Sequence, residues 1–162
     1  MQQILTVQSN RQLTSNVFEM KLSGNLSKIT RPGQFVNLKL EGLYLRRPIS
    51  VCDYTKDSLT IIYKVVGKGT ELMSKMTGGE KIDTLVGLGN GFDISVQTSN
   101  PVLIGGGVGT PPMYNLCKAL KAQGKTVTVI LGFNTKSEVF YEEEFNAIAD
   151  KLIIKTADGS YG

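Results

Sequence analysis

Near the middle of the chain, an apolar run meets a glycine cluster and two prolines: Leu103-Ile104-Gly105-Gly106-Gly107-Val108-Gly109-Thr110-Pro111-Pro112. The apolar run predicts a buried strand, and the glycines predict a tight turn whose backbone can approach a ligand closely. Pro111 suits the first position of a helix, which Thr110 is expected to cap. Because free amides at a helix start attract phosphates, the stretch indicates a nucleotide pyrophosphate site. Thr110 replaces the third glycine of a G-x-G-x-x-G fingerprint, so a strand-to-helix turn without a ligand is the alternative.

The residues after Pro101 alternate between strand and helix patterns. Strands are predicted at 102–104, 127–131 and 152–154, and the second is nearly continuously apolar, as in a parallel strand covered on both faces. Helical spacing relates two sets of apolar residues: Met113, Leu116, Cys117 and Leu120, and then Tyr141, Phe145, Ile148 and Ala149. This order predicts part of a doubly wound α/β nucleotide fold, with ligands at the carboxyl ends of its parallel strands.

Residues 1–86 instead show the period-two alternation of antiparallel strands, clearest at 18–22, 36–40 and 59–65. Short strands separated by turn residues predict a barrel or a sandwich. One short helix is expected between them, capped by Thr70 and ended by Gly78. A glycine-rich and then polar stretch at 87–100 places the domain boundary there, so we predict a barrel domain over 1–97 and an α/β domain over 98–162.

Composition excludes several classes of function. The chain has no histidine, which excludes histidine-based acid–base chemistry, and its two separated cysteines supply no metal site. The net charge of +4 comes from scattered basic residues, so we expect no nucleic-acid partner. No apolar run approaches the roughly 20 residues of a membrane span. The start also lacks a secretory signal, so we expect a cytoplasmic location and no membrane partner.

Two barrel segments repeat the anion-binding pattern. In Arg46-Arg47-Pro48-Ile49-Ser50, a proline inside a strand indicates an edge or a neighbouring ligand, and arginine offers paired donors to phosphate. The alternative is an ordinary exposed arginine pair. In Tyr63-Lys64-Val65-Val66-Gly67-Lys68-Gly69-Thr70, a strand leads through a glycine turn to a helix start, although a simple loop would look the same. Together the segments indicate two nucleotides at the domain junction, between which a hydride can pass without histidine.

The ordered motifs resemble those of the ferredoxin-reductase-like flavoproteins. Within that superfamily the chain is similar, over nearly its whole length, to the electron-transfer subunits of class 1B (NAD-dependent) dihydroorotate dehydrogenases. The motifs that carry the resemblance are Leu45-Arg46-Arg47-Pro48-Ile49-Ser50, Gly67-Lys68-Gly69-Thr70, Leu88-Gly89-Asn90-Gly91-Phe92, the 105–112 turn, Leu131-Gly132-Phe133, Phe140-Tyr141-Glu142-Glu143-Glu144-Phe145 and Asp158-Gly159-Ser160-Tyr161-Gly162.

The resemblance implies a Greek-key barrel that binds FAD, followed by a domain that binds NAD. The implied FAD contacts come from three segments: Arg47, Pro48, Ile49 and Ser50; Ile62, Tyr63 and Lys64; and Gly69 with Thr70. Arg47 would pair with the pyrophosphate, and the Ser50 hydroxyl would address the N5 edge of the flavin, which makes Ser50 the candidate catalytic residue. The implied NAD contacts are Gly106, Gly107, Gly109 and Thr110.

In this family, electrons arrive from an FMN-containing catalytic subunit through a [2Fe–2S] cluster, reach FAD and leave as hydride to NAD+. The family's four cluster cysteines belong after Gly162, so we expect an incomplete chain that cannot hold the cluster. Val86-Gly87 replaces the family's Gly-Pro, which we expect to matter little. The alternatives are a reductase subunit serving sulfide, glutamate synthase or hydrogenase chemistry, or a truncated module without catalysis.

Two charged segments carry weaker expectations. The loop Asn134-Thr135-Lys136 has no acidic residue to enforce NAD over NADP, and Lys136 would even accommodate an extra phosphate. The run Glu142-Glu143-Glu144 fits a solvated helix start, where acidic residues are favoured by the helix dipole.

Overall fold

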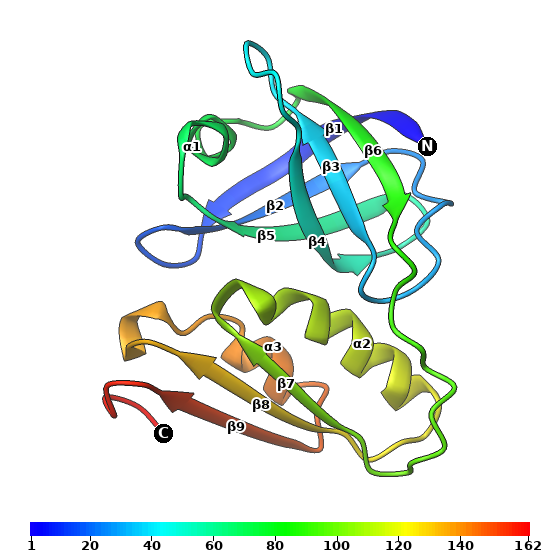
Figure 1. Ribbon diagram of the computed structural model, residues 1–162, viewed down its shortest axis with the longest axis vertical. Coiled ribbons are helices and arrows are strands. Elements are labelled where there is room, and N and C mark those ends of the chain that lie inside the picture. Colours follow the sequence, from blue (N-terminus) through cyan, green and yellow to red (C-terminus); the bar gives the residue numbers. More distant parts are fainter.

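The computed structural model describes residues 1–162 as two stacked parts, a closed barrel and a parallel sheet whose helices face the barrel (Figure 1). The barrel strands are β1 (Gln2–Gln12), β2 (Val17–Ser23), β3 (Phe35–Lys39), β4 (Arg47–Tyr54), β5 (Ser58–Lys64) and β6 (Lys81–Leu88), with helix α1 (Lys68–Ser74) between the last two. The second part contains β7 (Val102–Gly106), α2 (Pro111–Ala122), β8 (Thr128–Phe133), α3 (Glu142–Asn146) and β9 (Lys151–Thr156), with single-turn 3₁₀ helices η1 (Gly107–Gly109) and η2 (Lys136–Glu138).

The barrel closes in the order β1-β2-β5-β4-β3-β6, and every pairing is antiparallel. Alternate side chains point inward, as with Leu59, Ile61 and Tyr63 of β5, and fill a core of 16 buried residues. The predicted Greek-key barrel is therefore confirmed.

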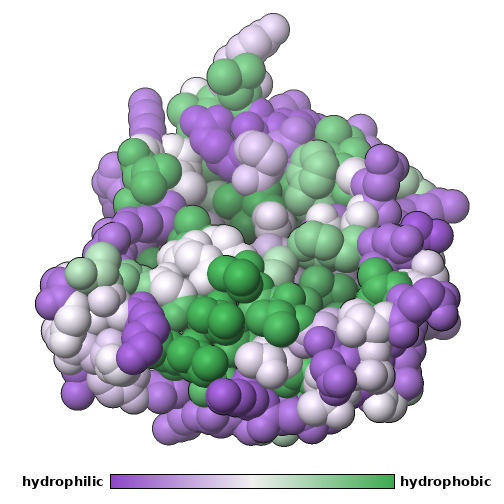
Figure 2. All heavy atoms as spheres, turned by 60° about the horizontal axis from the view of Figure 1, so that its bottom comes forward, coloured by the Kyte–Doolittle hydropathy of each residue, from purple (hydrophilic) through white to green (hydrophobic).

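The parallel sheet has the order β7-β8-β9, in register from the Val102–Thr128 pair onward. Both helices lie on the face turned toward the barrel (Figure 1), since successive right-handed crossovers in one direction place their helices on the same side. The predicted α/β architecture is confirmed. The expectation that the second strand, β8, is covered on both faces is wrong, because only its alternate residues are buried and Ile130 is half-buried. On the same open face, Ile104 of β7 is 71% exposed and Val102 is 56% exposed. Figure 2 shows the apolar patch on the side of the molecule that includes this face.

A second core joins the two parts. Val17, Cys52 and Ile62 point outward from the barrel and are buried against residues of α2 and the parallel sheet. The predicted boundary between residues 97 and 98 falls in the segment 89–101 that connects β6 to β7. The division into two domains stays a prediction, because the halves share this buried contact.

Both predicted helix caps are wrong in detail. Helix α1 starts at Lys68 and ends at Ser74, so Thr70 lies inside its first turn and Gly78 lies beyond its end. Thr110 precedes α2 but already has helical backbone angles, and its side chain makes no capping hydrogen bond. Pro111 does occupy the first helical position, as predicted. None of the helices has the length and apolar character that crossing a membrane requires.

Candidate functional site

A cavity of about 350 Å³ opens in the barrel wall beside the parallel sheet. Its lining contains Arg47, Pro48, Ile49 and Ser50 of β4, Ile62, Tyr63 and Lys64 of β5, Val66 and Thr70 near α1, and Val108 of the glycine turn. Every barrel residue that the sequence indicated, apart from Gly69, therefore borders this one space.

The cavity exists because β4 and β5 diverge. Their registered pairs run from Tyr54–Leu59 to Val51–Ile61 and stop there. Beyond this point β4 pairs only with β3, where Pro48 faces Asn37. A proline is tolerated inside this closed barrel because its segment of β4 is paired on one side alone. β4 is therefore not an edge strand, because the barrel is closed. At Pro48, however, β4 has one unpaired side, and Pro48 lines the cavity.

The two adjacent arginines have different surroundings. Arg46 crosses to β6, where its Nη2 lies 3.0 Å from Asp83 Oδ2 and its Nη1 donates to the carbonyl oxygens of Asn37 and Asp83. Arg47 has no carboxylate partner; it donates to the Leu45 carbonyl and lies against Gly69. A Cβ built on Gly69 would come within 2.7 Å of Arg47 Cζ, so a bare glycine is needed for this approach. Arg46 therefore links β4 to β3 and β6 within the barrel, whereas the positive charge of Arg47 lies at the start of α1.

The start of α1 is organised by Thr70. Its hydroxyl accepts hydrogen bonds from the amides of Val66 (2.9 Å) and Gly67 (3.3 Å) and donates to the Gly67 carbonyl (3.0 Å). Thr70 thus shapes the turn with its side chain. The amides of Lys68, Gly69 and Thr70 belong to the first helical turn, where they have no acceptor within the helix. These amides, together with the nearby Arg47 guanidinium, form a donor set suited to a pyrophosphate.

Tyr63 forms a rigid wall of the same cavity. Its ring stacks on Phe18, with centroids 6.0 Å apart, and its hydroxyl donates to Asn10 Oδ1 at 2.9 Å. The Asn10 amide in turn donates to the carbonyl oxygens of Met73 (2.8 Å) and Met76 (3.0 Å). Burial raises the pKa of Tyr63 to about 12, so the phenol stays neutral. The stacking of its ring on Phe18 and the hydrogen bond of its hydroxyl to Asn10 together fix the position of Tyr63.

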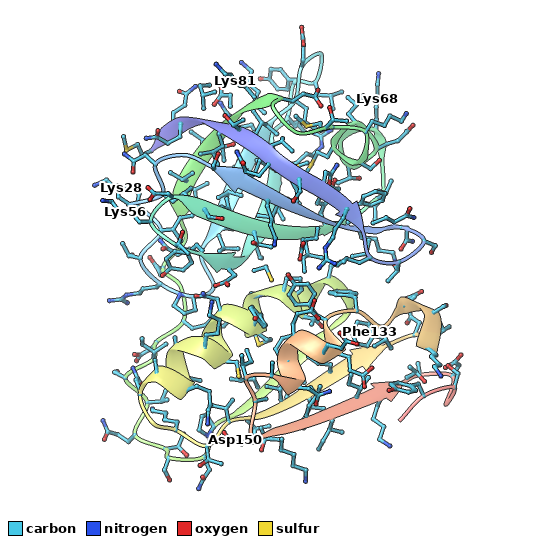
Figure 3. All side chains as sticks on the ribbon, turned by 180° about the vertical axis from the view of Figure 1, so that it is seen from behind. Lys28, Lys56, Lys68, Lys81, Phe133 and Asp150 are labelled. Carbon is cyan, nitrogen blue, oxygen red and sulfur yellow. The ribbon has the colours of Figure 1, made fainter.

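A second cavity, of about 480 Å³, lies at the carboxyl ends of the parallel strands. Its lining contains Gly106, Gly107, Gly132, Phe133, Asn134, Glu138, Lys155, Thr156 and Ala157. Figure 3 shows Phe133 at this end of the sheet and Asp150 at the other. Of the residues predicted for NAD, Gly106 and Gly107 line this cavity, whereas Gly109 and Thr110 do not.

A third cavity, of about 270 Å³, lies between the other two. It shares Lys64 and Val108 with the barrel cavity, and it shares Gly106, Gly107 and Phe133 with the cavity over the sheet. The three spaces therefore adjoin one another in a row from the barrel to the parallel sheet, at the ligand-binding end of an α/β fold.

The glycine turn differs from a simple helix-start phosphate site. Pro111 and Pro112 have no amide hydrogens, and the amides of Thr110 and Met113 already donate to the carbonyl oxygens of Gly107 and Thr110. The donors left for a ligand are those of the η1 turn itself. Thr110 is fully buried, with its hydroxyl unpaired, and it does not border this cavity, so its contact with a nucleotide stays a prediction.

Sequence reasoning missed Glu138. The segment Asn134-Thr135-Lys136 has no acidic residue, but Glu138 of the following η2 turn borders the cavity, where its carboxylate accepts a hydrogen bond from Asn134 Nδ2 at 2.9 Å. The run Glu142–Glu144 does not form an additional carboxylate site: Glu142 accepts from the Tyr161 hydroxyl, and Glu144 lies 3.7 Å from Arg11.

The cysteines are free and buried, and burial raises the pKa of both thiols, that of Cys117 to about 11. No group of three or more cysteine or acidic side chains has a geometry that could hold a metal ion. The donor set of this chain therefore does not fit a [2Fe–2S] cluster, which needs four ligands.

Comparison with known proteins agrees with this geometry. Residues 103–155 match the family model of the oxidoreductase NAD-binding domain. Proteins described as the electron transfer subunit of dihydroorotate dehydrogenase B (NAD(+)) are 45% identical in Bacillus pumilus and 42% identical in Fusobacterium nucleatum, over 98% and 97% of this chain. The chain spans 64% and 63% of the length of these two relatives.

Solved structures lead in the same direction. An NADH-dependent reduced ferredoxin-NADP oxidoreductase is 34% identical, with a TM-score of 0.86 over 98% of this chain and 58% of that chain. Phthalate dioxygenase reductase, at 16% identity and a TM-score of 0.80 over 98% and 52% of the two chains, shows the same fold. In sequence and in its arrangement of a barrel and a parallel sheet, the chain is thus similar, over nearly its whole length, to the electron transfer subunits of dihydroorotate dehydrogenase B (NAD(+)).

Proposed function

We propose that this chain binds FAD in the barrel cavity and NAD in the two adjoining cavities, and passes electrons from the flavin to NAD+. The observation that carries the proposal is the row of adjoining cavities, in which Lys64 and Val108 border both the proposed flavin site and the space beside the glycine turn. Two redox cofactors that meet there can exchange a hydride directly, which accounts for a site without histidine.

The residues of the barrel cavity suit the parts of FAD. Arg47 and the amides at the start of α1 would hold the pyrophosphate, with Gly69 leaving room for the guanidinium. The walls formed by Ile49, Ile62 and Tyr63 would exclude water from the flavin ring. Ser50 would offer its hydroxyl to the reactive edge of the ring. FAD supplies the redox chemistry when bound, while these side chains bind, orient and enclose it.

The sheet cavity suits the dinucleotide. The η1 turn and Gly106 leave the backbone bare where the nicotinamide nucleotide would approach, and Gly109 keeps the turn free of side chains although it does not border the cavity. Lys64 would lie between the two cofactors as a positive charge without a carboxylate partner in the structure. Glu138 would face the ribose hydroxyls of the adenosine half, which favours NAD over NADP.

We further propose that the whole protein serves dihydroorotate oxidation in pyrimidine synthesis, in the cytoplasm, with an FMN-containing catalytic subunit as its partner. The relatives at 40–45% identity support this assignment. Because the residues of this chain do not fit a [2Fe–2S] cluster, the cluster would need ligands outside these 162 residues.

Flavin binding tests the first proposal. The purified chain, incubated with FAD and passed through a desalting column, should emerge yellow with a bound-flavin absorption spectrum. Arg47→Ala should weaken FAD binding, whereas Arg31→Ala, which removes an exposed arginine outside the cavity, should leave it unchanged. A chain that stays colourless with excess FAD would refute flavin binding.

The partner is tested in the assembled enzyme. Mixing the whole protein, including the residues that hold the cluster, with the FMN-containing catalytic subunit, dihydroorotate and NAD+ should produce NADH, which is measured by its absorbance. If flavin binds but no NADH forms, the protein serves another electron donor.

A further inference from the structure

A buried carboxylate lies at the junction between the barrel and the parallel sheet. Glu19 of β2 is only 2% exposed. Arg11 of β1 holds it from the barrel side, with Nε 2.7 Å from Oε1 and Nη2 3.2 Å from Oε2. From the other part of the molecule, the Tyr141 hydroxyl donates a hydrogen bond to the same carboxylate. A charge-assisted bond therefore connects the two halves inside the protein.

Tyr141 is held in an unusual conformation to make this bond. Its φ of 64° is the only positive φ of any non-glycine residue. A bulky side chain in the left-handed region is strained, and such a residue persists where its surroundings fix it. Here the Tyr114 ring packs edge-on at 5.4 Å, and Glu19 receives the hydroxyl. The strained backbone thus aims one side chain at one acceptor across the junction.

The bond joins residues adjacent to two walls of the cavity that lies between the two proposed cofactor sites. That cavity is lined by Val17 of β2 and by Phe140. Val17 precedes Glu19 by two residues on the same strand, and Phe140 is the neighbour of Tyr141 in the chain. Any separation of Tyr141 from Glu19 would therefore also separate the two walls of this cavity.

A second polar contact across the junction lies elsewhere on the barrel. Asp53 of β4 accepts hydrogen bonds from Asn115 Nδ2 (2.8 Å) and Lys118 Nζ (2.6 Å) of α2. It anchors the helix and not the segment that carries Phe140. A third contact, between Arg11 and Glu144 of α3 at 3.7 Å, joins side chains that are 56% and 37% exposed. The hydrogen bond between Tyr141 and Glu19 is therefore the buried polar contact that holds the 139–141 segment against the barrel.

We propose that the Tyr141–Glu19 hydrogen bond is a positioning link that sets the distance between the flavin and the nicotinamide. This inference rests on the proposed function for its catalytic consequence, but the link itself concerns only residues of this chain. Neither Tyr141 nor Glu19 lines the barrel cavity or the sheet cavity. Their effect on electron transfer would therefore act through Val17 and Phe140, which line the cavity between the two sites.

Tyr141→Phe tests the link, since it removes one hydroxyl and keeps the packed ring. Tyr161→Phe is the matched control, because the Tyr161 hydroxyl also donates to a carboxylate, Glu142 at 2.8 Å, but within one half of the molecule. In the FAD-loaded chain, Tyr141→Phe should leave FAD affinity within about twofold. The limiting rate of flavin reduction by NADH should fall roughly 10- to 100-fold, as expected when reacting groups shift by about 1 Å. The NADH concentration for half-saturation should stay near that of the parent chain.

Two further readouts separate positioning from loss of stability. The long-wavelength absorbance of the flavin–nicotinamide complex should decrease in Tyr141→Phe and persist in Tyr161→Phe. Hydrogen exchange should accelerate at residues 17–19 and 139–141 in Tyr141→Phe and stay unchanged there in Tyr161→Phe. Glu19→Gln, which keeps the shape of the acceptor but removes its charge, should show a smaller change in the same direction.

Unchanged hydrogen exchange in Tyr141→Phe would overturn the link, whether or not flavin binds. Faster exchange with an unchanged limiting rate and absorbance would overturn its role in positioning. If the parent chain does not bind FAD, or is not reduced by NADH, the proposed function is refuted, and so is the role of the bond in electron transfer. The hydrogen-exchange result would still decide whether the Tyr141–Glu19 bond joins the two halves.

Discussion

The guanidinium of Arg47 lies directly on the backbone of Gly69, at the start of α1. A Cβ on Gly69 would approach Arg47 Cζ to 2.7 Å and Nη2 to 2.9 Å. The charge at the mouth of the barrel cavity is thus positioned by the absence of a side chain. Because Arg47 is flexible and has no carboxylate partner, a methyl group at Gly69 would displace the arginine and not the backbone.

Gly69→Ala should therefore separate stability from cofactor affinity. Alanine favours a helix by about 1 kcal/mol over glycine, so thermal unfolding of the cofactor-free protein should occur at the same or a higher temperature. FAD affinity should nevertheless fall about tenfold, which corresponds to ~1.4 kcal/mol. Calorimetry and fluorescence titration with FAD measure the two effects. Equal FAD affinity in both proteins would contradict the role assigned to this contact.

Arg46 and Arg47 should respond in opposite ways to replacement by alanine. Arg47→Ala removes a charge from the cavity and should weaken FAD binding by about 1.5–3 kcal/mol with little change in stability. Arg46→Ala breaks the contact with Asp83, in which both side chains are 21% exposed, and should instead lower the free energy of unfolding. We expect a loss of about 1–2 kcal/mol, since partial exposure weakens such pairs. Urea unfolding and FAD titration of both variants measure the two effects. Loss of stability in Arg47→Ala together with loss of FAD affinity in Arg46→Ala would refute the assignment.

Glu138 should govern the choice between NADH and NADPH. Its carboxylate would repel a 2′-phosphate, so Glu138→Gln should raise the preference for NADPH relative to NADH by about tenfold, or ~1.4 kcal/mol. Glu143→Gln, an exposed acidic residue on α3, is the matched control. The measurement is the ratio of kcat/KM for flavin reduction by the two nucleotides. A ratio that changes equally in both variants would show only a general effect of charge.

Glu19 should make the protein sensitive to acid. Burial raises the pKa of its carboxyl, but the hydrogen bonds from Arg11 and Tyr141 outweigh this effect and hold the pKa below its ordinary value of 4.5. Because the unfolded chain then binds the proton more readily, this contribution to stability is complete above about pH 4.5 and is lost as the pH falls through the lower folded pKa. Glu19→Gln should therefore be less stable at pH 7 and show a flatter acid limb in urea unfolding between pH 7 and 3. Parallel curves would contradict this account.

Local sequence patterns were sufficient for the elements, whereas most residues of the barrel cavity were indicated by the resemblance to the flavoproteins. Alternation along β5 separates core residues such as Tyr63 from outward residues such as Ile62, and the proline in β4 indicates a strand with an open side. The eight residues indicated on β4, β5 and α1 come together because two neighbouring strands of a closed barrel diverge at one end. Gly69 was also indicated; it does not line the cavity, but it lies against the Arg47 guanidinium that does.

Other features depend on information that a local pattern does not contain. Thr110 fails as a cap because its backbone is already helical and two prolines follow it. Glu138 enters the sheet cavity because a single 3₁₀ turn reverses the chain after β8. The bond between Tyr141 and Glu19 joins residues 122 positions apart, and it depends on a left-handed tyrosine that no propensity favours.

The open face of the parallel sheet determines how this chain behaves when it is concentrated. Ile104 and Val102 present aliphatic surface on β7, an edge strand with unpaired backbone groups on its free side. Aliphatic surface beside a free strand edge promotes self-association. Light scattering of the purified chain should consequently rise with concentration and with added sulfate, and a lysine in place of Ile104 should keep the solution monodisperse.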